Sequence, residues 1–339
     1  MRQRLLWHDP RLRALLASGL VWVTAAALAP DWLSAAGDRA IDILRRAVLA
    51  RGEVNYSAVA TVVDRESGRG ARAFTEIRLC KQGGKQRIKV SDGENRLIVV
   101  RVSDGATLWE HYEVRGILVK RTLPSMSERR ERDLESLAIL ARNFSAKLVG
   151  TETVAGRPAY RIRIDRPGSP SATVRQFWID KRTYLELKAE RYGEGGGVVD
   201  STALTNVNFS PEYPPGCFDF QRPPNLIPKV VDDTAFRGSL AEAEKHAGFT
   251  AIRPKTVPAG FALLVRSVAV SKRGGTPALW LRYTNGIDAF SLFQRRAASA
   301  SVTPQTRGPV RQWVYKGFQF TLVGHLTPQQ VDAIRASYR

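Results

Sequence analysis

The sequence predicts an α+β protein in which one large, strongly curved antiparallel sheet with covering helices precedes a smaller α+β domain. Apolar and polar residues alternate with a period of two over most of residues 56–209, as in strands with one buried face. Turn signals such as Asp92-Gly93 and Asp104-Gly105 separate these segments by hairpin-length connections, so neighbouring strands are expected to pair antiparallel. A proline-punctuated segment then separates them from a shorter region with its own helices and strands, which predicts a second domain.

The first 36 residues have the layout of an export signal. Four arginines precede a run of 16 uncharged residues: Arg2, Arg4, Arg11 and Arg13 come before residues 14–29. We expect cleavage after Ala36. An uncleaved anchor is the alternative, but the run is shorter than the ~20 apolar residues that cross a bilayer comfortably. The mature chain is therefore expected outside the cytoplasm.

Two helices and about ten strands are expected before residue 222. Asp38 can cap a helix that carries Ile41, Leu44 and Val48 on one face and ends at Gly52. A second, strongly charged helix is expected over residues 127–144, where it could cover the sheet. Its common apolar face is expected to hold Leu134, Leu137, Ala138 and Ala141. The expected strands are 56–62, 75–79, 88–90, 98–102, 107–111, 117–121, 160–164, 174–179, 185–189 and 203–209.

The smaller domain is expected to begin and end with a short helix. Ser239 and Glu242 have the spacing of a capping box for a helix that ends near Gly248. Thr327-Pro328 begins the last helix, which carries Val331 and Ile334. Strands are expected between these helices at 263–270, 278–283, 289–294, 312–315 and 319–323.

Enzymatic signatures are not evident in the sequence. The four histidines, His8, His111, His246 and His325, are not spaced with Cys, Asp or Glu as metal ligands are. Nucleotide-binding loops and a nucleophile elbow are also missing. Carboxylates alternate with Arg and Lys on faces expected to be exposed, so no general acid and base pair stands out. We expect no catalytic residues, metal or cofactor.

A curved sheet with an apolar inner face encloses either a packed core or a cavity for acyl chains, and the sequence leaves both open. The candidate lining residues are Ile77, Leu79, Ile98, Val100, Trp109, Leu118, Trp178, Leu187, Val207 and Phe209. The two cysteines, Cys80 and Cys217, are compatible with one disulfide in an oxidising compartment and equally with two separate buried thiols.

The formal charge of +20 favours anionic partners. Lipid headgroups, lipopolysaccharide, an anionic polymer or an acidic protein segment would all fit, and so would a plain solvated surface. Nucleic acid is not expected, because an exported protein rarely meets it and no recognition-helix or zinc signature is present. A second copy of the chain also remains open as a partner.

Several short motifs occur in a fixed order along the chain. Residues 154–162 read VAGRPAYRI, residues 178–180 read WID, residues 185–188 read LELK and residues 207–211 read VNFSP. With the export leader and the early helix before Tyr56, they resemble the N-terminal domain of the MucB/RseB family. That domain is related in fold to the lipoprotein carriers LolA and LolB, so the resemblance implies a half-barrel sheet of that type. Residues 257–261 (VPAGF), 283–286 (YTNG) and 320–324 (FTLVG) resemble the small domain that follows it.

The resemblance sets the expected boundaries and function. It implies a signal peptide at 1–36, a LolA/LolB-like domain at 37–222, a linker at 223–235 and a small α+β domain at 236–339. It also implies a non-enzymatic periplasmic regulator of an envelope-stress sigma-factor pathway. Such a regulator binds the extracytoplasmic part of a transmembrane anti-sigma factor and senses lipid or lipopolysaccharide in an apolar cavity.

Two other functions compete with this reading. A periplasmic lipid or lipoprotein carrier of the LolA type would use the same apolar groove, but residues 236–339 give it no evident advantage. A cell-envelope hydrolase lacks an arrangement of nucleophile and base in the sequence.

Overall fold

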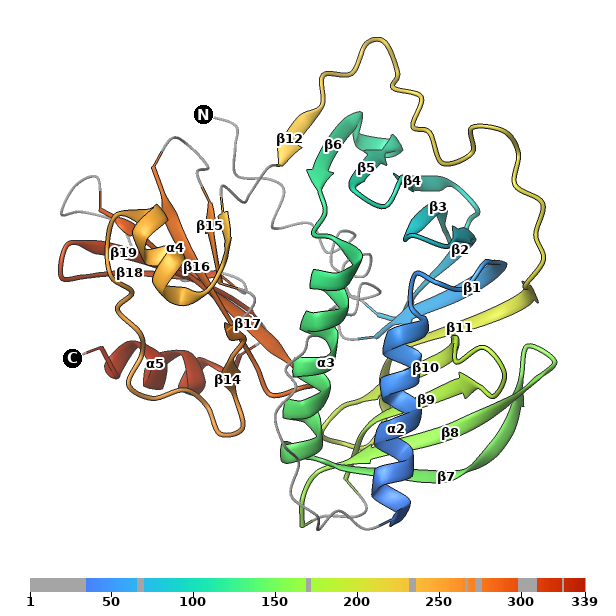
Figure 1. The fold of residues 1–339 in the computed structure, drawn as a ribbon, viewed down its shortest axis with the longest axis horizontal. Helices are drawn as coiled ribbons and strands as arrows, with labels where there is room; N and C mark the ends of the chain where they lie inside the picture. Colours follow the sequence, from blue (N-terminus) through green and yellow to red (C-terminus); the bar gives the residue numbers. More distant parts are fainter. Residues whose placement is uncertain are drawn as a thin grey trace. The chain divides into compact units, whose positions relative to one another are not determined.

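The computed structural model describes residues 35–65, 70–168, 172–231, 236–265, 268–271, 276–297, 310–324 and 326–338. These residues form two compact units (Figure 1). Unit 1 holds residues 35–130 and 144–231, and unit 2 holds residues 131–143 together with residues 236–338. Apart from Ala35 and Ala36, the expected export signal lies outside the described residues, as do His8 and His325. None of the helices among the described residues is both long and apolar enough to cross a membrane.

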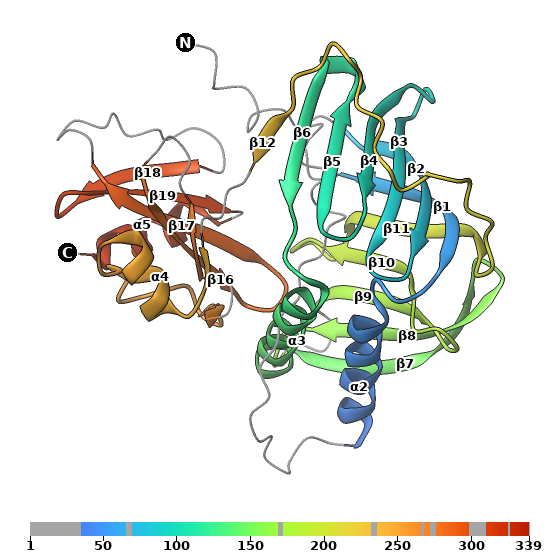
Figure 2. The same ribbon diagram turned by 45° about the horizontal axis from the view of Figure 1, so that its top comes forward.

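Unit 1 is built on a large sheet that confirms the predicted α+β architecture. Its order is β12-β6-β5-β4-β3-β2-β1-β11-β10-β9-β8-β7, and the two end strands do not pair, so the sheet stays open (Figure 2). Its first strands are β1 (Tyr56–Asp64), β2 (Arg72–Lys81), β3 (Lys85–Asp92), β4 (Leu97–Ser103), β5 (Thr107–Tyr112) and β6 (Ile117–Thr122). The remaining strands are β7 (Ser145–Val154), β8 (Arg157–Asp165), β9 (Thr173–Asp180), β10 (Glu186–Tyr192), β11 (Val198–Asn208) and β12 (Lys229–Val231).

The predicted turns hold the strands in register. Between β4 and β5, the Asp104 carboxylate accepts the backbone N–H groups of Ala106 and Thr107 at 2.8 and 2.6 Å. Gly105 has a φ of +103°, and a Cβ at that position would lie 2.3 Å from the carbonyl oxygen of Gly83. Only glycine fits there, because the next hairpin turn approaches so closely.

Two strands of the large sheet were not anticipated. β7 carries few apolar residues and is half exposed at one end of the sheet, so its alternation is weak. β12 lies within the segment expected to be a linker, and it pairs with β6 in parallel rather than antiparallel. The sheet is therefore antiparallel except at this one pairing. A 3-10 turn, η1 (Glu113–Arg115), connects β5 to β6.

Helix α2 (Ala35–Ala50) packs against β7 and β9. Figures 1 and 2 both show it against that end of the sheet. Ile43, Leu44 and Val48 are each 4% exposed, so the apolar face largely follows the prediction. The sequence predicted that Asp38 caps this helix, and this prediction is wrong. α2 begins at Ala35, so Asp38 lies within the helix and not at its N-cap.

Helix α3 (Met126–Asn143) confirms the second predicted helix but not its predicted buried face. Ala138 is exposed, whereas Asp133, Glu135 and Ser136 are buried. The carboxylate of Glu135 accepts the backbone N–H of Val265 at 3.2 Å, which gives this buried acid a partner. Polar neighbours in unit 2 therefore decide which side of residues 131–143 is covered.

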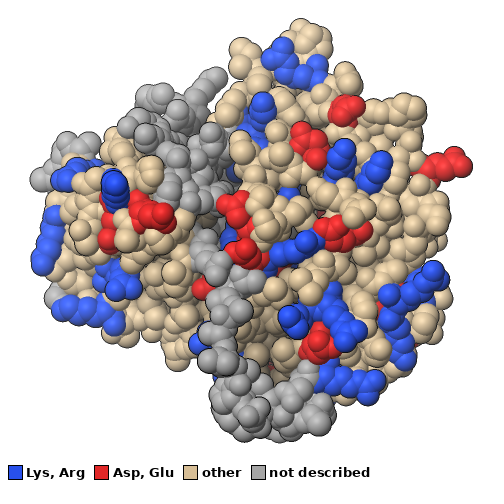
Figure 3. Space-filling view, viewed as in Figure 1, with Lys and Arg blue, Asp and Glu red and all other residues tan. Residues whose placement is uncertain are grey.

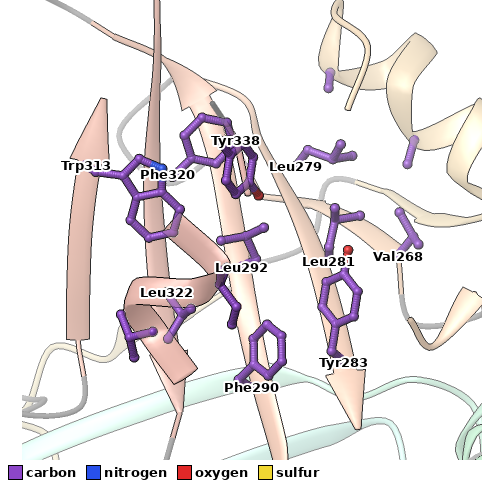
Figure 4. Close-up of a cluster of buried hydrophobic side chains, with 14 of the residues drawn as sticks. Val268, Leu279, Leu281, Tyr283, Phe290, Leu292, Trp313, Phe320, Leu322 and Tyr338 are labelled. Atoms are coloured by element: carbon purple, nitrogen blue, oxygen red, sulfur yellow. The ribbon is translucent and has the colours of Figure 1, made fainter. Parts of the chain in front are cut away.

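Unit 2 wraps a second sheet around an aromatic core. Its elements are β13 (Phe236–Gly238), α4 (Leu240–Ala247), β14 (Ala262–Leu263), β15 (Val268–Ser271), β16 (Ala278–Thr284), β17 (Ala289–Arg296), β18 (Val310–Tyr315), β19 (Phe318–Gly324) and α5 (Pro328–Ala336). The main strand order is β13-β15-β16-β17-β19-β18. Both predicted capping boxes are present, at Ser239 for α4 and at Thr327 for α5. Figure 4 shows the core, where the rings of Trp313, Phe320 and Tyr338 all contact one another. The centroid of Phe320 lies 5.5 Å from that of Trp313 and 4.7 Å from that of Tyr338, and the centroids of Trp313 and Tyr338 lie 5.7 Å apart.

The last residues of α3 contact the turn between β16 and β17 within unit 2. The side-chain amide of Asn143 donates to the carbonyl oxygens of Gly260 and Asn285 at 2.6 and 2.9 Å. Gly286 has a φ of +97°, and a Cβ there would lie 2.5 Å from the backbone of Leu140. The predicted Asn285-Gly286 turn is thus also the docking point of the helix.

Candidate functional site

The large sheet has two distinct faces that the strand register separates. Phe177 pairs across the strands with Ala189, then Thr202, Val62 and Phe74, so these five side chains share one side. We call this side the helix face, because α2 covers it at β7–β9. The opposite side, which carries Trp109 and its paired neighbours, is the strap face.

The helix face is apolar where α2 covers it. Ile162, Ile164, Phe177 and Ile179 share this face, and none is more than 1% exposed. Each fully buried side chain of this size contributes roughly 1.5–3 kcal/mol to folding. This end of the sheet is a packed apolar layer under the helix.

The same face becomes charged over β2–β6. Five charged side chains share this face: Arg78 and Glu76 on β2, Arg101 on β4, Glu110 on β5 and Arg121 on β6, with the apolar Ile88 and Val90 of β3 between the first two and the rest. The side chains of Glu76 and Glu110 are only 2% and 4% exposed. We call these five residues the charged row. With three arginines and two carboxylates, the row carries one net positive charge.

Each buried carboxylate of the charged row lies between two arginines. Glu76 is 2.5 Å from Arg78 and 3.9 Å from Arg101. Glu110 is 3.5 Å from Arg101 and 2.9 Å from Arg121. Burying a carboxylate away from water costs several kcal/mol unless charged partners replace the water. Glu76 and Glu110 are therefore stable in the sheet only while their neighbouring arginines are present.

Two titratable groups beside the row stay protonated at neutral pH. Burial raises the pKa of Tyr56, and burial also raises the pKa of the Cys80 thiol. Farther along the row, burial and then the charge of Glu110 raise the pKa of Tyr112 to about 12. A thiol with a raised pKa has little thiolate at neutral pH and is a poor nucleophile.

The strap face is crossed by residues 213–226, which we call the strap. The ring of Phe220 stacks on Trp109 with centroids 5.0 Å apart, and Arg87 Nη1 donates to the carbonyl oxygen of Cys217 at 3.2 Å. Figures 1 and 2 show the chain passing around the outside of the sheet between β11 and β12. The strap follows this path and packs on β3 and β5.

The structure does not gather the ten candidate lining residues into one surface. Ile77, Leu79, Val100, Trp109 and Leu118 lie on the strap face, and Ile77 is 52% exposed. Ile98 follows a bulge and joins the helix-face cluster around Val90 and Phe74. A role in ligand binding stays a prediction for all ten.

The other four candidates lie near the β8–β11 end. Trp178 and Leu187 belong to one cluster with Ala58, Ala60, Ala159 and Leu204, and Val207 packs against it. The Trp178 ring also has Lys188 Nζ 4.2 Å from its centroid, and its Nε1 donates to Glu152 at 2.6 Å. Phe209 lies 4.4 Å from the guanidinium carbon of Arg157, measured to the ring centroid.

Cys80 and Cys217 are free thiols in the structure. Cys80 lies on the helix face of β2, where its cross-strand partner is Tyr56 on β1. Cys217 lies in the strap, where burial raises its pKa and the charges of Arg87 and Lys81 oppose that shift. Both thiols are partly buried, and a disulfide between them stays a prediction.

The sequence did not reveal the charged row, because Arg and Glu in an alternating strand are normally on the solvent side. One signal was present: Arg101 interrupts the apolar run of β4, six of whose seven residues are buried. Metal-ligand geometry gives no competing site, since no group of three or more His, Cys, Asp or Glu in the described part of the chain could hold a metal ion.

Comparison with known proteins gives the family of this chain. The MucB/RseB N-terminal domain matches residues 39–223. A comparison with curated proteins finds no match. A crystal structure of MucB is similar over 88% of this chain and 97% of its own, with 16% identity and a TM-score of 0.50. A structure described as the complex of Pseudomonas aeruginosa MucA/MucB is similar over 87% of this chain and 96% of its own, with 18% identity and a TM-score of 0.52.

These matches extend across both units in fold, and the family match covers more than half of the chain in sequence. The charged row and the strap-face candidates all lie inside the matched range or on strands within it. The chain belongs to the MucB/RseB family through its N-terminal domain at residues 39–223.

Proposed function

We propose that the chain is a non-enzymatic extracytoplasmic regulator that binds the extracytoplasmic part of a membrane anti-sigma factor. The observation that carries this proposal is the family match over residues 39–223, joined to a fold likeness that continues through unit 2. One of the solved structures with this fold is described as a MucA/MucB complex, and 96% of its chain is similar to this chain. A carrier of the LolA type has no evident use for unit 2.

Lipid or lipopolysaccharide sensing is the second part of the proposal. An amphiphile has an apolar body and a charged head, and the helix face has both characters. Beside the charged row it carries the apolar cluster of Val62, Phe74 and Val90, and the row ends at Arg121, whose side chain is 37% exposed. Arginine on such a surface suits phosphate or carboxylate groups because its planar guanidinium donates two parallel hydrogen bonds.

Partner binding can be tested on the full chain by copurification and hydrogen–deuterium exchange. The bait is the extracytoplasmic segment of a single-span anti-sigma factor encoded beside this chain. We expect capture of the chain and slower exchange within residues 236–338. The matched control is the extracytoplasmic segment of an unrelated single-span protein, which should capture nothing. Absence of capture would contradict binding of the anti-sigma factor, and protection confined to residues 39–223 would contradict a part for unit 2 in that binding.

Deleting residues 236–339 is a poorer test, because the deletion also removes the groups that Asn143 and Leu140 contact. Loss of binding could then reflect a damaged α3. Exchange measured on the intact chain separates the two causes, since α3 keeps its neighbours throughout.

The lipid part has its own readout. Fluorescent lipopolysaccharide should bind the chain, and Arg121→Gln, at the more exposed end of the charged row, should weaken that binding while a far-ultraviolet spectrum shows the sheet intact. Lys89→Gln, which removes an exposed cation on the strap face, is the control. Equal loss in both variants would show that the charged row has no special part in recognition.

A further inference from the structure

A basic patch covers the solvent side of α2 and the turn beside it. The patch consists of Arg39, Arg45, Arg46, Lys181 and Arg182, all exposed. We call it the α2 patch. Figure 3 shows Lys and Arg side chains gathered over this helix with few acidic groups among them.

The two parts of the α2 patch are joined by a direct contact within unit 1. Arg46 Nη1 donates to the Tyr184 hydroxyl at 3.0 Å, and the Arg46 guanidinium carbon lies 5.4 Å from the Tyr184 ring centroid. Tyr184 closes the tight turn that carries Lys181 and Arg182, with its backbone N–H donating to the Asp180 carbonyl at 3.0 Å. The contact therefore holds the turn that carries Lys181 and Arg182 beside α2.

The α2 patch has little internal compensation. α2 carries two acidic residues, Asp38 and Asp42, and Asp42 lies 2.9 Å from Arg46. Hydrogen bonds to Tyr184 and then the charge of Asp42 raise the pKa of Arg46 above its ordinary value. Five cations are set against these two acidic residues, so the patch keeps an excess of positive charge.

An apolar side chain lies among these cations. Leu49 is 40% exposed and follows Arg45 and Arg46 by one helical turn. A helix that lies on a membrane surface has this composition, with arginines for anionic headgroups and a leucine that enters the headgroup boundary. An acidic polypeptide would need the cations but not the exposed leucine.

The sequence places α2 close to an apolar segment. Five residues, 30–34, separate the uncharged run of residues 14–29 from the start of α2 at Ala35. Five residues span at most about 18 Å when fully extended. In the alternative of an uncleaved anchor, which keeps this run attached, α2 is held within this distance of the headgroups.

We propose that the α2 patch is a docking surface for anionic lipid headgroups, which holds the regulator at the membrane that carries its partner. The proposal concerns lipid and does not depend on the identity of the anti-sigma factor. Lipid binding at α2 and copurification with that factor are measured separately, so either can fail alone.

The test is sedimentation of the full chain with vesicles of phosphatidylcholine, with or without one third phosphatidylglycerol. The readout is the ratio of binding to the anionic vesicles over binding to the neutral ones. Insertion of the uncharged residues 14–29 would add equally to binding of both vesicles, so it does not change this ratio. We expect the ratio to favour the anionic vesicle and to fall as salt rises, because screening weakens exposed charges.

The patch variant is R39Q/R45Q/R182Q, which leaves the Arg46–Tyr184 contact intact. Each basic residue near an anionic membrane is worth about fivefold in binding, so three removals should reduce the ratio on the order of 100-fold. The matched control is K85Q/K89Q/R222Q, which removes three exposed cations at β3 and in the strap, five strand positions from β9 in the sheet order. It should leave the ratio nearly unchanged.

Three results would overturn the proposal. The first is equal binding of the native chain to both vesicles, and the second is equal loss in the patch and control variants. The third is a patch variant that keeps vesicle binding but no longer binds poly-glutamate, which would assign the patch to an acidic polypeptide. Thermal unfolding of both variants, with midpoints matching the native chain, shows that the fold is not the cause.

Discussion

Replacing Gly286 by alanine should loosen the contact between α3 and the β16–β17 turn far more than an ordinary glycine substitution does. The new Cβ would lie 2.5 Å from the Cα and the N of Leu140 and 2.6 Å from its Cβ. These atoms belong to a helix backbone that cannot rotate away. The turn, the helix or both must move.

The expected magnitude has two parts. A non-glycine residue with a positive φ costs about 1 kcal/mol, and Gly286 has a φ of +97°. Forcing an extra methyl group into a filled site adds about 1–3 kcal/mol. Gly286→Ala should therefore destabilise this contact by about 2–4 kcal/mol.

Gly317 provides the matched control. It has a φ of +74° in the β18–β19 turn, but nothing lies within 4 Å of the Cβ that alanine would add. Gly317→Ala therefore carries the backbone cost without the collision, and we expect about 1 kcal/mol. The difference between the two variants isolates the close approach of α3.

Hydrogen–deuterium exchange followed peptide by peptide is the suitable assay, because a chain with two units need not unfold in a single step. In Gly286→Ala, peptides covering residues 136–143 should exchange on the order of 100-fold faster. In Gly317→Ala, the change should be roughly fivefold and confined to residues 310–324. Equal effects in the two variants would refute the described docking of α3.

The remaining predictions concern unit 1. Asp180→Asn should lower stability by about 3 kcal/mol, because the fully buried carboxylate is 2.6 Å from Arg157. Burial opposes ionisation of Asp180, but the Arg157 hydrogen bond and the turn N–H groups outweigh it and lower the pKa of Asp180. The stability that Asp180 contributes is therefore present above its unfolded pKa and is lost as pH falls through the lowered pKa of the folded state. Urea melts at a series of acidic pH values measure this loss. An Asp180→Asn variant with the same acid dependence as the native chain would contradict the prediction. Trp109→Ala should free the strap, because Phe220 loses its stacking partner, and faster exchange of strap amides alone is expected; an unchanged strap would contradict the contact. Burial, and then a neighbouring carboxylate, raise the pKa of Tyr112 to about 12. The folded state therefore binds the Tyr112 proton more tightly than the unfolded state, and stability should fall as pH rises from about 10 toward 12. An ultraviolet titration that shows Tyr112 ionised at about pH 10 in the folded chain would disprove this.

Strand alternation and turn residues were sufficient to predict most of the architecture from sequence. Period-two patterns located β1–β6, and the two capping boxes located α4 and α5. Alternation and capping boxes depend only on residues that are close together in the sequence, so both can be recognised without a structure. The edge strands β7 and β12 were missed because pairing at an edge requires little apolar character.

The candidate site was less predictable, because the face to which a residue points depends on register and bulges. Leu118 and Val119 are both buried, so both faces of β6 are covered and alternation gives no contrast there. A bulge beside Val90 carries Ile98 to the helix face, although Val100 stays on the strap face. No local pattern shows that Glu76 would meet Arg101 across an intervening strand.

The parallel pairing of β12 has a practical consequence for work with fragments. The family match ends at residue 223, whereas β12 begins at Lys229 and covers the outer backbone groups of β6. A fragment cut at the family boundary would leave β6, with its buried Leu118 and Val119, as an unprotected border open to pairing with another molecule. Fragments of this protein should therefore extend through Val231, so that the segment with the composition of a linker continues to cover the β6 edge of the large sheet.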